Sequence, residues 1–383
     1  MNKSKPKQND SLKTRKIRIK VVGLGGGGSS IVSEVAQNLN NVSFMVADTD
    51  SKTFKKVKKG IKTFQFGEKF THSMGTGMNP ELAQKAAVAE KDKIAKIFQD
   101  QDLSIIIGSL GGGVASGAGP VFAEAAKNQK NISLGIFTTP FLFEGEKKMR
   151  IAKKAIDNLR EHLSGIIVVP NEKIFQITDK RMPLKKALAV LDGIFASWLE
   201  DLITVILKPS LINIDFADLK TILKDRGHQL FLGQVVSQGP NRTEEIIKKM
   251  FQNSIFETGP KEVSRILFNI TGGKDLKLRE VEAIAEAVSE LNQRAKIVFG
   301  ITESPKYLNK IQITLLAVSE LEKKEKKEKK KKKKKPEEKK KEVIKPKRKT
   351  AVEVKKEKEK ETEREWETES DWDVPAFLRK QIK

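Results

Sequence analysis

The sequence predicts an α/β protein with a parallel-sheet domain, a long central helix and a second α+β domain, between disordered tails. Short apolar runs alternate with helical patterns up to about residue 183, which is typical of a parallel sheet. Apolar residues then recur every three or four positions from Leu184 to Leu207, which indicates one amphipathic helix. A Lys- and Glu-rich run beyond residue 320 has too few apolar side chains to form a core.

These patterns divide the chain into seven segments. They are a disordered basic arm (1–16), the parallel-sheet domain (17–183), the central helix (184–208), a loop region with two carboxylates (209–226), the α+β domain (227–319), a disordered Lys/Glu-rich linker (320–371) and a terminal peptide (372–383).

The positive charge is concentrated in the tails. The 383 residues include 74 Lys and Arg and 50 Asp and Glu, a net charge of +24. A balance this basic suggests nucleic acid or an acidic surface as a partner. However, residues 322–349 hold 18 of the basic and 6 of the acidic residues, and no aromatic side chain interleaves them. We interpret this run as a solvated linker and do not expect nucleic-acid binding.

The composition argues against several other classes of protein. The sequence has no cysteine, which excludes a disulfide framework and a Cys-based zinc site, and its three histidines stand far apart. The N-terminus lacks the apolar segment of a signal peptide. No apolar run approaches the roughly 18 residues of a membrane span. We expect a cytoplasmic protein without membrane insertion and without a metal site of its own.

The first glycine-rich loop follows the first strand. Ile17–Val22 reads as a strand that enters a sheet, and Gly23, Gly25 and Gly28 then match G-x-G-x-x-G before a helix that begins at Ile31. The next strand ends at Asp48-Thr-Asp50, and an acid about 20 residues after the glycines also suits a dinucleotide-binding enzyme. An NAD-type enzyme is therefore a competing interpretation at this point.

A second glycine-rich loop follows the apolar strand Leu103–Ile107. Gly111–Gly113 leave the backbone bare, and amides at the start of a helix form an anion site. Pro120 is expected at the start of that helix, and the alternative is a tight turn that binds nothing. Another glycine-containing turn, 73–80, precedes a predicted helix over 81–99. Two complete loops at one sheet edge favour a longer phosphate chain over a single pyrophosphate.

The other predicted elements follow from the same periodicities. They are strands near 133–137, 166–170, 231–236, 265–271, 295–301 and 311–318, and helices from about 150 to 163, 243–251 and 277–292.

Two further features lie outside these elements. Asp215 and Asp218 are three residues apart, so they share a face if a helix opens there, and paired carboxylates can polarise a water or hold a cation. The alternative is that they cap the helix. The last residues, Trp372 to Lys383, place the apolar Val374, Ala376, Phe377 and Leu378 next to basic residues, which suggests a docking peptide.

Five of these stretches together resemble the FtsZ family, the bacterial tubulin-like GTPases of cell division, from about Lys16 to Val318 and again at the last dozen residues. The stretches are Ile19–Gly28, Ile105–Pro120, Thr139–Gly145, Ile212–Asp218 and Val374–Lys380.

The resemblance implies a tubulin-like GTPase domain that binds GTP or GDP with Mg²⁺ and polymerises head to tail into the filaments of a mid-cell division ring. It implies that Trp372–Lys383 bind membrane-tethering division proteins. It assigns the phosphates to Gly26, Gly27, Gly28, Ser29, Ser30, Gly111, Gly112, Gly113, Val114, Ala115, Ser116 and Gly117, the ribose side to Glu144 and Lys148, the nucleotide's surroundings to Asn171, and the guanine to Asp192.

The resemblance also implies that Asp215 and Asp218 enter the next subunit's pocket and position the attacking water, so that hydrolysis depends on assembly. The sequence departs from the family pattern at several positions. Val114 stands where a hydroxyl is usual, Ala115 where Gly is usual, and Asp48 where Asn is usual. Ser30, Lys148 and Leu188 replace Asn, Arg and an aromatic residue. These departures affect the expected nucleotide affinity and the rate of GTP hydrolysis. The alternative to an active GTPase is a filament-forming paralogue that binds nucleotide with little or no hydrolysis.

Overall fold

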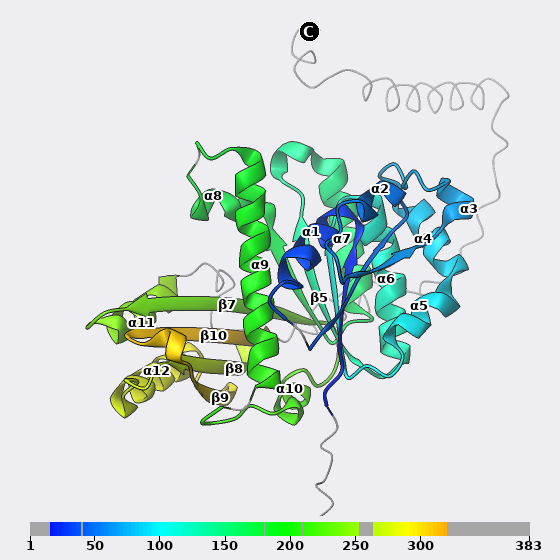
Figure 1. Cartoon of the computed structure of the whole chain (residues 1–383). Coiled ribbons are helices and arrows are strands. Elements are labelled where there is room, and N and C mark those ends of the chain that lie inside the picture. Colours follow the sequence, from blue (N-terminus) through cyan, green and yellow to red (C-terminus); the bar gives the residue numbers. More distant parts are fainter. Residues whose placement is uncertain (1–15, 40, 180, 209, 253–262, 320–383) are drawn as a thin grey trace, which may run out of the picture. The chain divides into compact units, whose positions relative to one another are not determined.

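The computed structural model describes residues 16–39, 41–179, 181–208, 210–252 and 263–319 (Figure 1). The basic arm up to residue 15, the linker and the terminal docking peptide lie outside the described residues. Within the described part, none of the helices combines the length and the apolar character needed to cross a membrane.

The first part of the fold is a parallel sheet of six strands. The strands are β1 (Ile19–Leu24), β2 (Ser43–Asp48), β3 (Lys62–Gln65), β4 (Leu103–Ser109), β5 (Ile132–Thr139) and β6 (Gly165–Pro170). They lie in the order β3-β2-β1-β4-β5-β6, and each adjacent pair is parallel. A parallel sheet is covered on both faces, which explains why β4 is apolar at successive positions.

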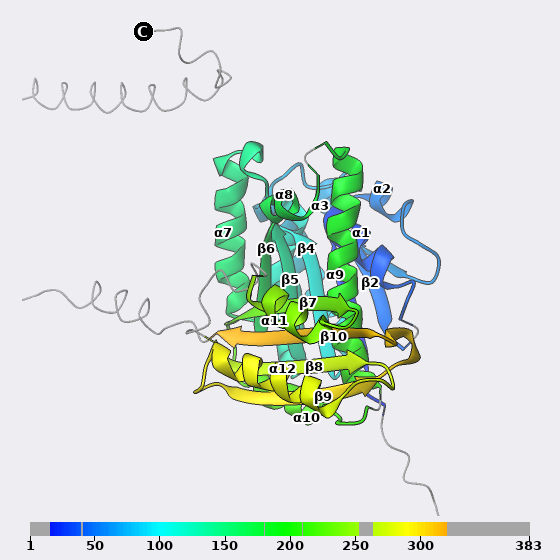
Figure 2. The ribbon, with the colours of Figure 1, turned by 90° about the vertical axis from the view of Figure 1, so that its left-hand side faces the viewer.

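Helices cover both faces of this sheet (Figures 1 and 2). They are α1 (Gly25–Val35), α2 (Ser51–Phe54), α3 (Glu68–Thr71), α4 (Pro80–Ala89), α5 (Lys91–Phe98), α6 (Gly113–Asn128), α7 (Glu146–Arg160), α8 (Ile174–Ile177) and α9 (Leu184–Leu207). In β4, Ile105 and Ile107 join the core formed with α1 and α9, whereas Ile106 joins the core formed with α4 to α7. The two faces thus separate by the twofold alternation of strand side chains.

The predicted second domain continues the same sheet. Its elements are α10 (Phe216–Ile222), β7 (His228–Gln238), α11 (Arg242–Gln252), β8 (Val263–Gly272), α12 (Leu278–Leu291), β9 (Lys296–Glu303) and β10 (Lys310–Ser319). Strand β7 pairs with the start of β6 through Gly165 and Ile166, and the order continues β7-β10-β8-β9. Figure 2 shows these four strands lying across the direction of β4 to β6. A separate core lies between β8, β10, α11 and α12.

The central helix α9 is confirmed with the predicted ends. It spans 24 residues, and its buried stripe includes Leu191, Phe195, Leu199 and Leu202. Figure 1 shows α8 at one end of α9 and α10 at the other.

Three expectations about helices are corrected by the structure. Helix α6 begins at Gly113, so Pro120 lies inside it and not at its start, because the glycines themselves form the first turn. Helix α1 likewise begins at Gly25, within its glycine run, instead of at Ile31. The helix predicted over 81–99 is two helices, which separate at Glu90 (φ −116°, ψ 23°). The Glu90 carboxylate there accepts a hydrogen bond from the Gly67 amide at 2.9 Å.

A polar network joins α9 to the second part of the sheet. Gln312 Nε2 donates to Asp201 Oδ2 at 2.9 Å, and Gln312 Oε1 accepts from Gln234 Nε2 at 2.7 Å and from the Tyr307 hydroxyl. The pKa of Asp201 is raised to about 6, mainly by burial of its carboxyl group. The hydrogen bond from Gln312 acts in the opposite direction and lowers the pKa.

We expect stability to fall as the pH rises from about 4 to about 6. In this window the folded protein keeps the proton on Asp201, whereas the unfolded chain, with an ordinary Asp pKa near 3.9, has lost it. Asp201→Asn should therefore be more stable than the parent at pH 7, by on the order of 1–2 kcal/mol. Urea unfolding at pH 4.5 and pH 7 measures this difference. Asp157→Asn, at an exposed position on α7, should leave the pH profile unchanged, and an unchanged profile in Asp201→Asn would contradict the account.

Candidate functional site

A cavity of about 470 Å³ lies at the carboxyl ends of β1, β2 and β4. Of the residues that the resemblance assigns to a nucleotide, the structure brings ten together in its lining: Gly26, Gly27, Gly111, Gly112, Gly113, Val114, Ala115, Glu144, Lys148 and Asn171. Parallel strands present their carboxyl ends at one edge, which is where ligands bind in open α/β sheets.

The first glycine loop is a close-packed turn into α1. A Cβ on Gly23 would lie 2.5 Å from the Gly28 carbonyl oxygen, and one on Gly28 would lie 2.6 Å from that of Ile107. Gly28 therefore packs the helix against the sheet. The cavity lining includes neither Gly28 nor the next two residues, Ser29 and Ser30. The N-terminal turn of α1, with Gly26 and Gly27, borders the cavity and offers backbone amides to an anion.

The second glycine loop turns at Gly111, whose φ of 94° is in the left-handed region. Its amide donates to Ser116 Oγ at 2.9 Å, so this buried hydroxyl holds the loop instead of facing the cavity. Ala115 lies in α6 with helical backbone, so it carries no left-handed strain. The start of α6, from Gly113, therefore supplies a second set of amides to the cavity.

The turn at 73–80 forms a third wall of the cavity. Its backbone is left-handed at Ser73, Gly75, Gly77 and Met78, and the Asn79 side chain caps α4 by accepting from two amides. The sequence indicates this turn, but it carries no motif that marks its residues as part of a site. The cavity residues missed in this way include Met74, Gly75, Thr76, Gly77 and Met78 of the turn, together with Thr53 of α2, Ser109 at the end of β4, Leu110 and Pro140.

Helix α6 and this turn approach each other closely at two glycines. A Cβ on Gly117 would lie 1.9 Å from the Pro80 carbonyl oxygen, and one on Gly113 would lie 2.1 Å from Thr76 Oγ1. Gly117 thus fixes the position of the turn without lining the cavity.

Gly117→Ala should destabilise the protein by about 1–3 kcal/mol, because the Pro80 backbone cannot rotate away from the added methyl group. Gly119→Ala is the matched control in the same helix, since its Cβ would meet its nearest neighbour at 3.5 Å. The control should be neutral or more stable by up to about 1 kcal/mol. Urea unfolding distinguishes the two, and equal stabilities would contradict the close approach.

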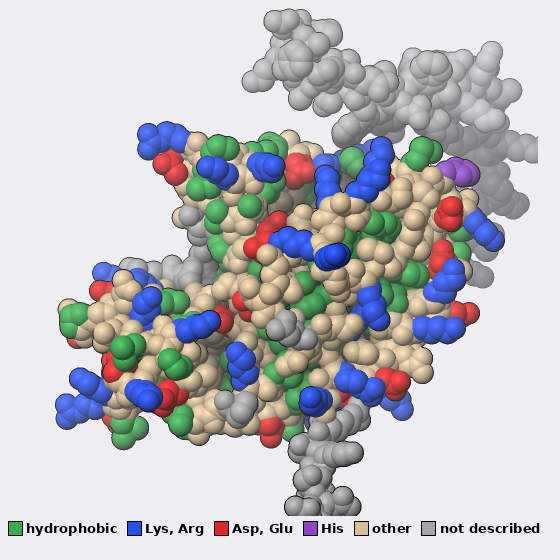
Figure 3. Space-filling view, in the orientation of Figure 1, with side chains coloured by type: hydrophobic (Ala, Val, Ile, Leu, Met, Phe, Trp, Pro, Cys, Tyr) green, Lys and Arg blue, Asp and Glu red, His purple; other side chains and the backbone are tan. Residues whose placement is uncertain are grey.

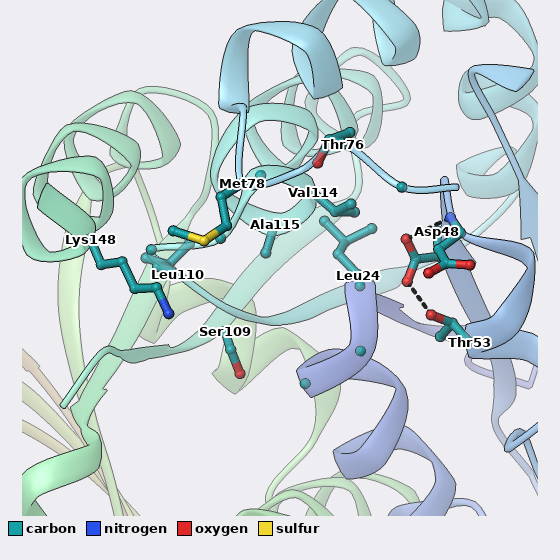
Figure 4. Close-up of a pocket in the computed structure, with 18 of the residues that line it drawn as sticks. Leu24, Asp48, Thr53, Thr76, Met78, Ser109, Leu110, Val114, Ala115 and Lys148 are labelled. Atoms are coloured by element: carbon teal, nitrogen blue, oxygen red, sulfur yellow. Dashed lines mark hydrogen bonds between the residues drawn. The ribbon is translucent and has the colours of Figure 1, made fainter. Parts of the chain in front are cut away.

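Opposite ends of the cavity carry different charges, as Figure 4 shows for Lys148 and Asp48. Lys148 Nζ lies 2.7 Å from Glu144 Oε2. Burial opposes ionisation of Glu144, but hydrogen bonds from Lys148 and from the Phe141 amide outweigh it and lower the pKa of the carboxyl. At the other end, Asp48 is 4 % exposed and accepts a hydrogen bond from Thr53 Oγ1 at 2.7 Å.

Asp192 lies on α9, outside the lining of the cavity. Burial is the main cause that raises the pKa of its carboxyl to about 6, and the nearby Glu34 of α1 adds to the effect. The residue that the resemblance assigns to the guanine therefore carries a half-buried carboxyl group near Glu34 of α1.

Asp215 and Asp218 form a reciprocal capping box at the start of α10. Asp215 Oδ1 accepts from the Asp218 amide at 2.8 Å, and Asp218 Oδ2 accepts from the Asp215 amide at 3.0 Å. The capping geometry anticipated as an alternative is thus present. Neither residue lines the cavity, and α10 lies beyond the end of α9 that is remote from α8 (Figure 1).

Oxygen donors at the Asp48 end fit a magnesium ion that arrives with a nucleotide. The carboxylates of Asp48 and Asp50 and the hydroxyl of Thr53 all line the cavity. Mg²⁺ usually binds one or two carboxylates together with phosphate oxygens, so it needs no larger protein cluster. Among the described residues, no group of three or more His, Cys, Asp or Glu is placed to hold a metal by itself.

Comparison with known proteins identifies the family. The model of the Tubulin/FtsZ family GTPase domain matches residues 18–179, and that of the FtsZ family C-terminal domain matches residues 229–319. A solved structure of FtsZ from M. jannaschii, a point mutant, is 30% identical with a TM-score of 0.72, and covers 79% of this chain and 91% of that one. The chain belongs to the Tubulin/FtsZ family.

Two further solved structures share the fold. An empty dimer of FtsZ from M. jannaschii is 29% identical with a TM-score of 0.73, covering 80% of this chain and 90% of that one. CetZ2 from Haloferax volcanii, solved as a GTPγS-bound protofilament, is 15% identical with a TM-score of 0.68, covering 81% and 96%. The Tubulin/FtsZ family is a GTPase family that binds GTP and GDP, which decides against the dinucleotide enzyme.

Proposed function

We propose that this protein binds GTP in the cavity and hydrolyses it to GDP and phosphate when a second copy supplies Asp215 and Asp218. The observation that carries the proposal is the separation of these carboxylates from the cavity. They follow the far end of α9, and 24 residues of helix span about 36 Å. One molecule cannot bring both parts together. A head-to-tail filament, in which the α10 end of one subunit meets the cavity of the next, does so at every interface.

The phosphates in this proposal lie between the first turns of α1 and α6, where backbone amides point to an anion. Glu144 and Lys148 hold the ribose side and Asn171 borders it. The role of Asp192 as an acceptor for the guanine is supported by the motif resemblance alone, because Asp192 lies outside the cavity lining. Asp48, Asp50 and Thr53 are the residues that would hold Mg²⁺ beside the phosphates. When bound, the ion would neutralise phosphate charge and stabilise the charge that develops on the leaving group.

The capping box uses only one oxygen of each catalytic carboxylate, so the other oxygen of each takes no part in the two capping hydrogen bonds. Asp215 uses Oδ1 and Asp218 uses Oδ2 to fix the backbone, so Asp215 Oδ2 and Asp218 Oδ1 can accept a proton from water. The capping bonds hold both side chains in place before the partner arrives. A carboxylate already positioned in this way loses little freedom when it orients the water.

The filaments would form a division ring at mid-cell in the cytoplasm, with Trp372–Lys383 bound to membrane-tethering proteins. The division ring and the role of the terminal peptide are supported by the motif resemblance alone. The peptide lies outside the described residues.

A second candidate is a filament-forming paralogue that binds nucleotide with little or no hydrolysis. Val114 and Ala115 favour it, because both line the cavity with apolar side chains at the phosphate loop. The Lys148–Glu144 ion pair favours it too. Lys148 is the sole cation among the described residues that line the cavity, and its charge is already paired with Glu144. Phosphate release from GTP separates the two candidates.

Asp215→Asn should lower GTP hydrolysis at least about 100-fold, because it removes the proton-accepting carboxylate. Asparagine is as good a helix cap as aspartate, so α10 should remain intact where alanine would remove the cap as well. Phosphate release and GTP binding are measured together, and binding should not change. Asp157→Asn on α7 is the control, with the parental rate expected. Full activity of Asp215→Asn would refute the assignment.

A further inference from the structure

A dense group of lysines lies between the second and third strands of the sheet. From Lys52 to Lys62 the sequence has six lysines in eleven residues and no acidic residue. They begin in α2, continue through the connection after it and end on β3. None of them lines the nucleotide cavity. We call this group the lysine patch, and its members are Lys52, Lys55, Lys56, Lys58, Lys59 and Lys62.

The fold keeps the lysine patch on the surface. Phe54, Val57 and Ile61 alternate with the lysines in the sequence, and they pack against the core that contains α1 and α9. All six lysines, by contrast, are exposed. Backbone hydrogen bonds fold the connection into turns, with the Val57 amide donating to the Phe54 carbonyl oxygen at 3.2 Å. The apolar residues therefore anchor a segment whose outer surface is lysine.

Most of the charge of the lysine patch is uncompensated. Among the described residues, one of its members takes part in an ion pair: Lys58 Nζ lies 3.4 Å from Glu34 Oε2, and both side chains are about half exposed. A pair so exposed contributes little. The positive charge is also felt inside the fold, because burial lowers the pKa of Lys20 to about 8 and repulsion from Lys62 adds to this effect. The segment therefore attracts an anionic partner.

Protection of the sheet edge accounts for one of these lysines. Strand β3 is the outermost strand of the sheet, and lysine on an edge strand discourages pairing with another chain. Lys62 lies on β3, whereas the other five lysines precede the strand. The lysine patch therefore needs a second explanation.

The chemistry of the lysine patch favours a lipid surface over a nucleic acid or a protein. Lysine is a point charge and lacks the planar fork with which arginine recognises a single phosphate or base edge. The one aromatic residue of the segment, Phe54, packs against the core and is not presented for stacking on bases. The segment also lacks an exposed large apolar side chain, which a protein interface would use as an anchor.

We propose that the lysine patch binds the surface of a membrane that contains anionic lipids, without inserting into it. Clusters of about four to eight basic residues are typical of such binding, and each residue near the surface tightens it about fivefold. Figure 1 shows α2 on the side of the protein remote from α11 and α12, so binding here brings the parallel-sheet side to the lipid. The inference does not depend on the proposed function.

The test is sedimentation of the full chain, without nucleotide, with vesicles of phosphatidylcholine alone or mixed with phosphatidylglycerol. The parent protein should bind the mixed vesicles and not the neutral ones. Salt at about 0.5 M should release it, because screening shortens the reach of the charges.

Charge reversal distinguishes the lysine patch from the basic ends of the chain. The double variant Lys55→Glu/Lys56→Glu should weaken binding to the mixed vesicles about twentyfold or more. The matched control is Lys153→Glu/Lys154→Glu, which changes the net charge equally at two exposed neighbours on α7. The control should stay within about threefold of the parent. Equal losses in the two double variants would overturn the inference.

A second measurement needs no variant. Acetic anhydride labels accessible lysines, and mass spectrometry reports the extent at each one. Bound mixed vesicles should protect Lys55, Lys56 and Lys59 and leave Lys153 and Lys154 reactive. Unchanged labelling of the lysine patch would overturn the inference, as would a parent protein that does not bind the mixed vesicles. Sedimentation without vesicles that the Lys55→Glu/Lys56→Glu variant loses would assign the patch to another copy of this chain and also overturn it.

Discussion

Helix α9 is the constraint on which the proposed mechanism depends. Its apolar stripe is buried in the core of the parallel sheet, so the helix is a rigid spacer of 24 residues. The cavity lining includes Asn171, which lies just before α8, and Figure 1 shows α8 at the end where α9 begins. Asp215 and Asp218 follow the other end of α9, next to α10. A spacer of about 36 Å keeps the carboxylates from reaching the phosphates of their own subunit. In the proposed mechanism, assembly is therefore a step of the chemistry, because every interface would supply what each subunit lacks.

Close contacts of the backbone at glycines give the cavity its shape, and the charged side chains lie on the walls that these contacts position. Gly113 and Gly117 bring α6 against the turn at 73–80, and the same helix start offers amides to phosphate. Amides attract an anion at the centre of the cavity, whereas Asp48 and Asp50 repel it at one end. Basic and acidic side chains are interspersed on the outer face shown in Figure 3.

Periodicity predicted the elements well and the loops poorly. The spacing of apolar residues located α9 with its ends at Leu184 and Leu207, and the second glycine loop pointed to a phosphate chain. Strand order alone would not have separated a GTPase from a dinucleotide enzyme, since β3-β2-β1-β4-β5-β6 also occurs in dinucleotide-binding folds. The start of α6 was wrong because glycine is a poor helix former, so the pattern there favours a turn. Met78 and Thr53 were missed because tertiary contacts, which leave no periodic signal, bring them to the cavity.

The dependence of GTP hydrolysis on protein concentration tests the central claim most directly. Phosphate release is measured with GTP and Mg²⁺ over a range of concentrations of the full chain. If the site is completed between subunits, activity per molecule should be close to zero at low concentration and rise steeply above the concentration at which filaments form. Activity per molecule that stays constant across the range would show that one subunit is sufficient and would contradict the account.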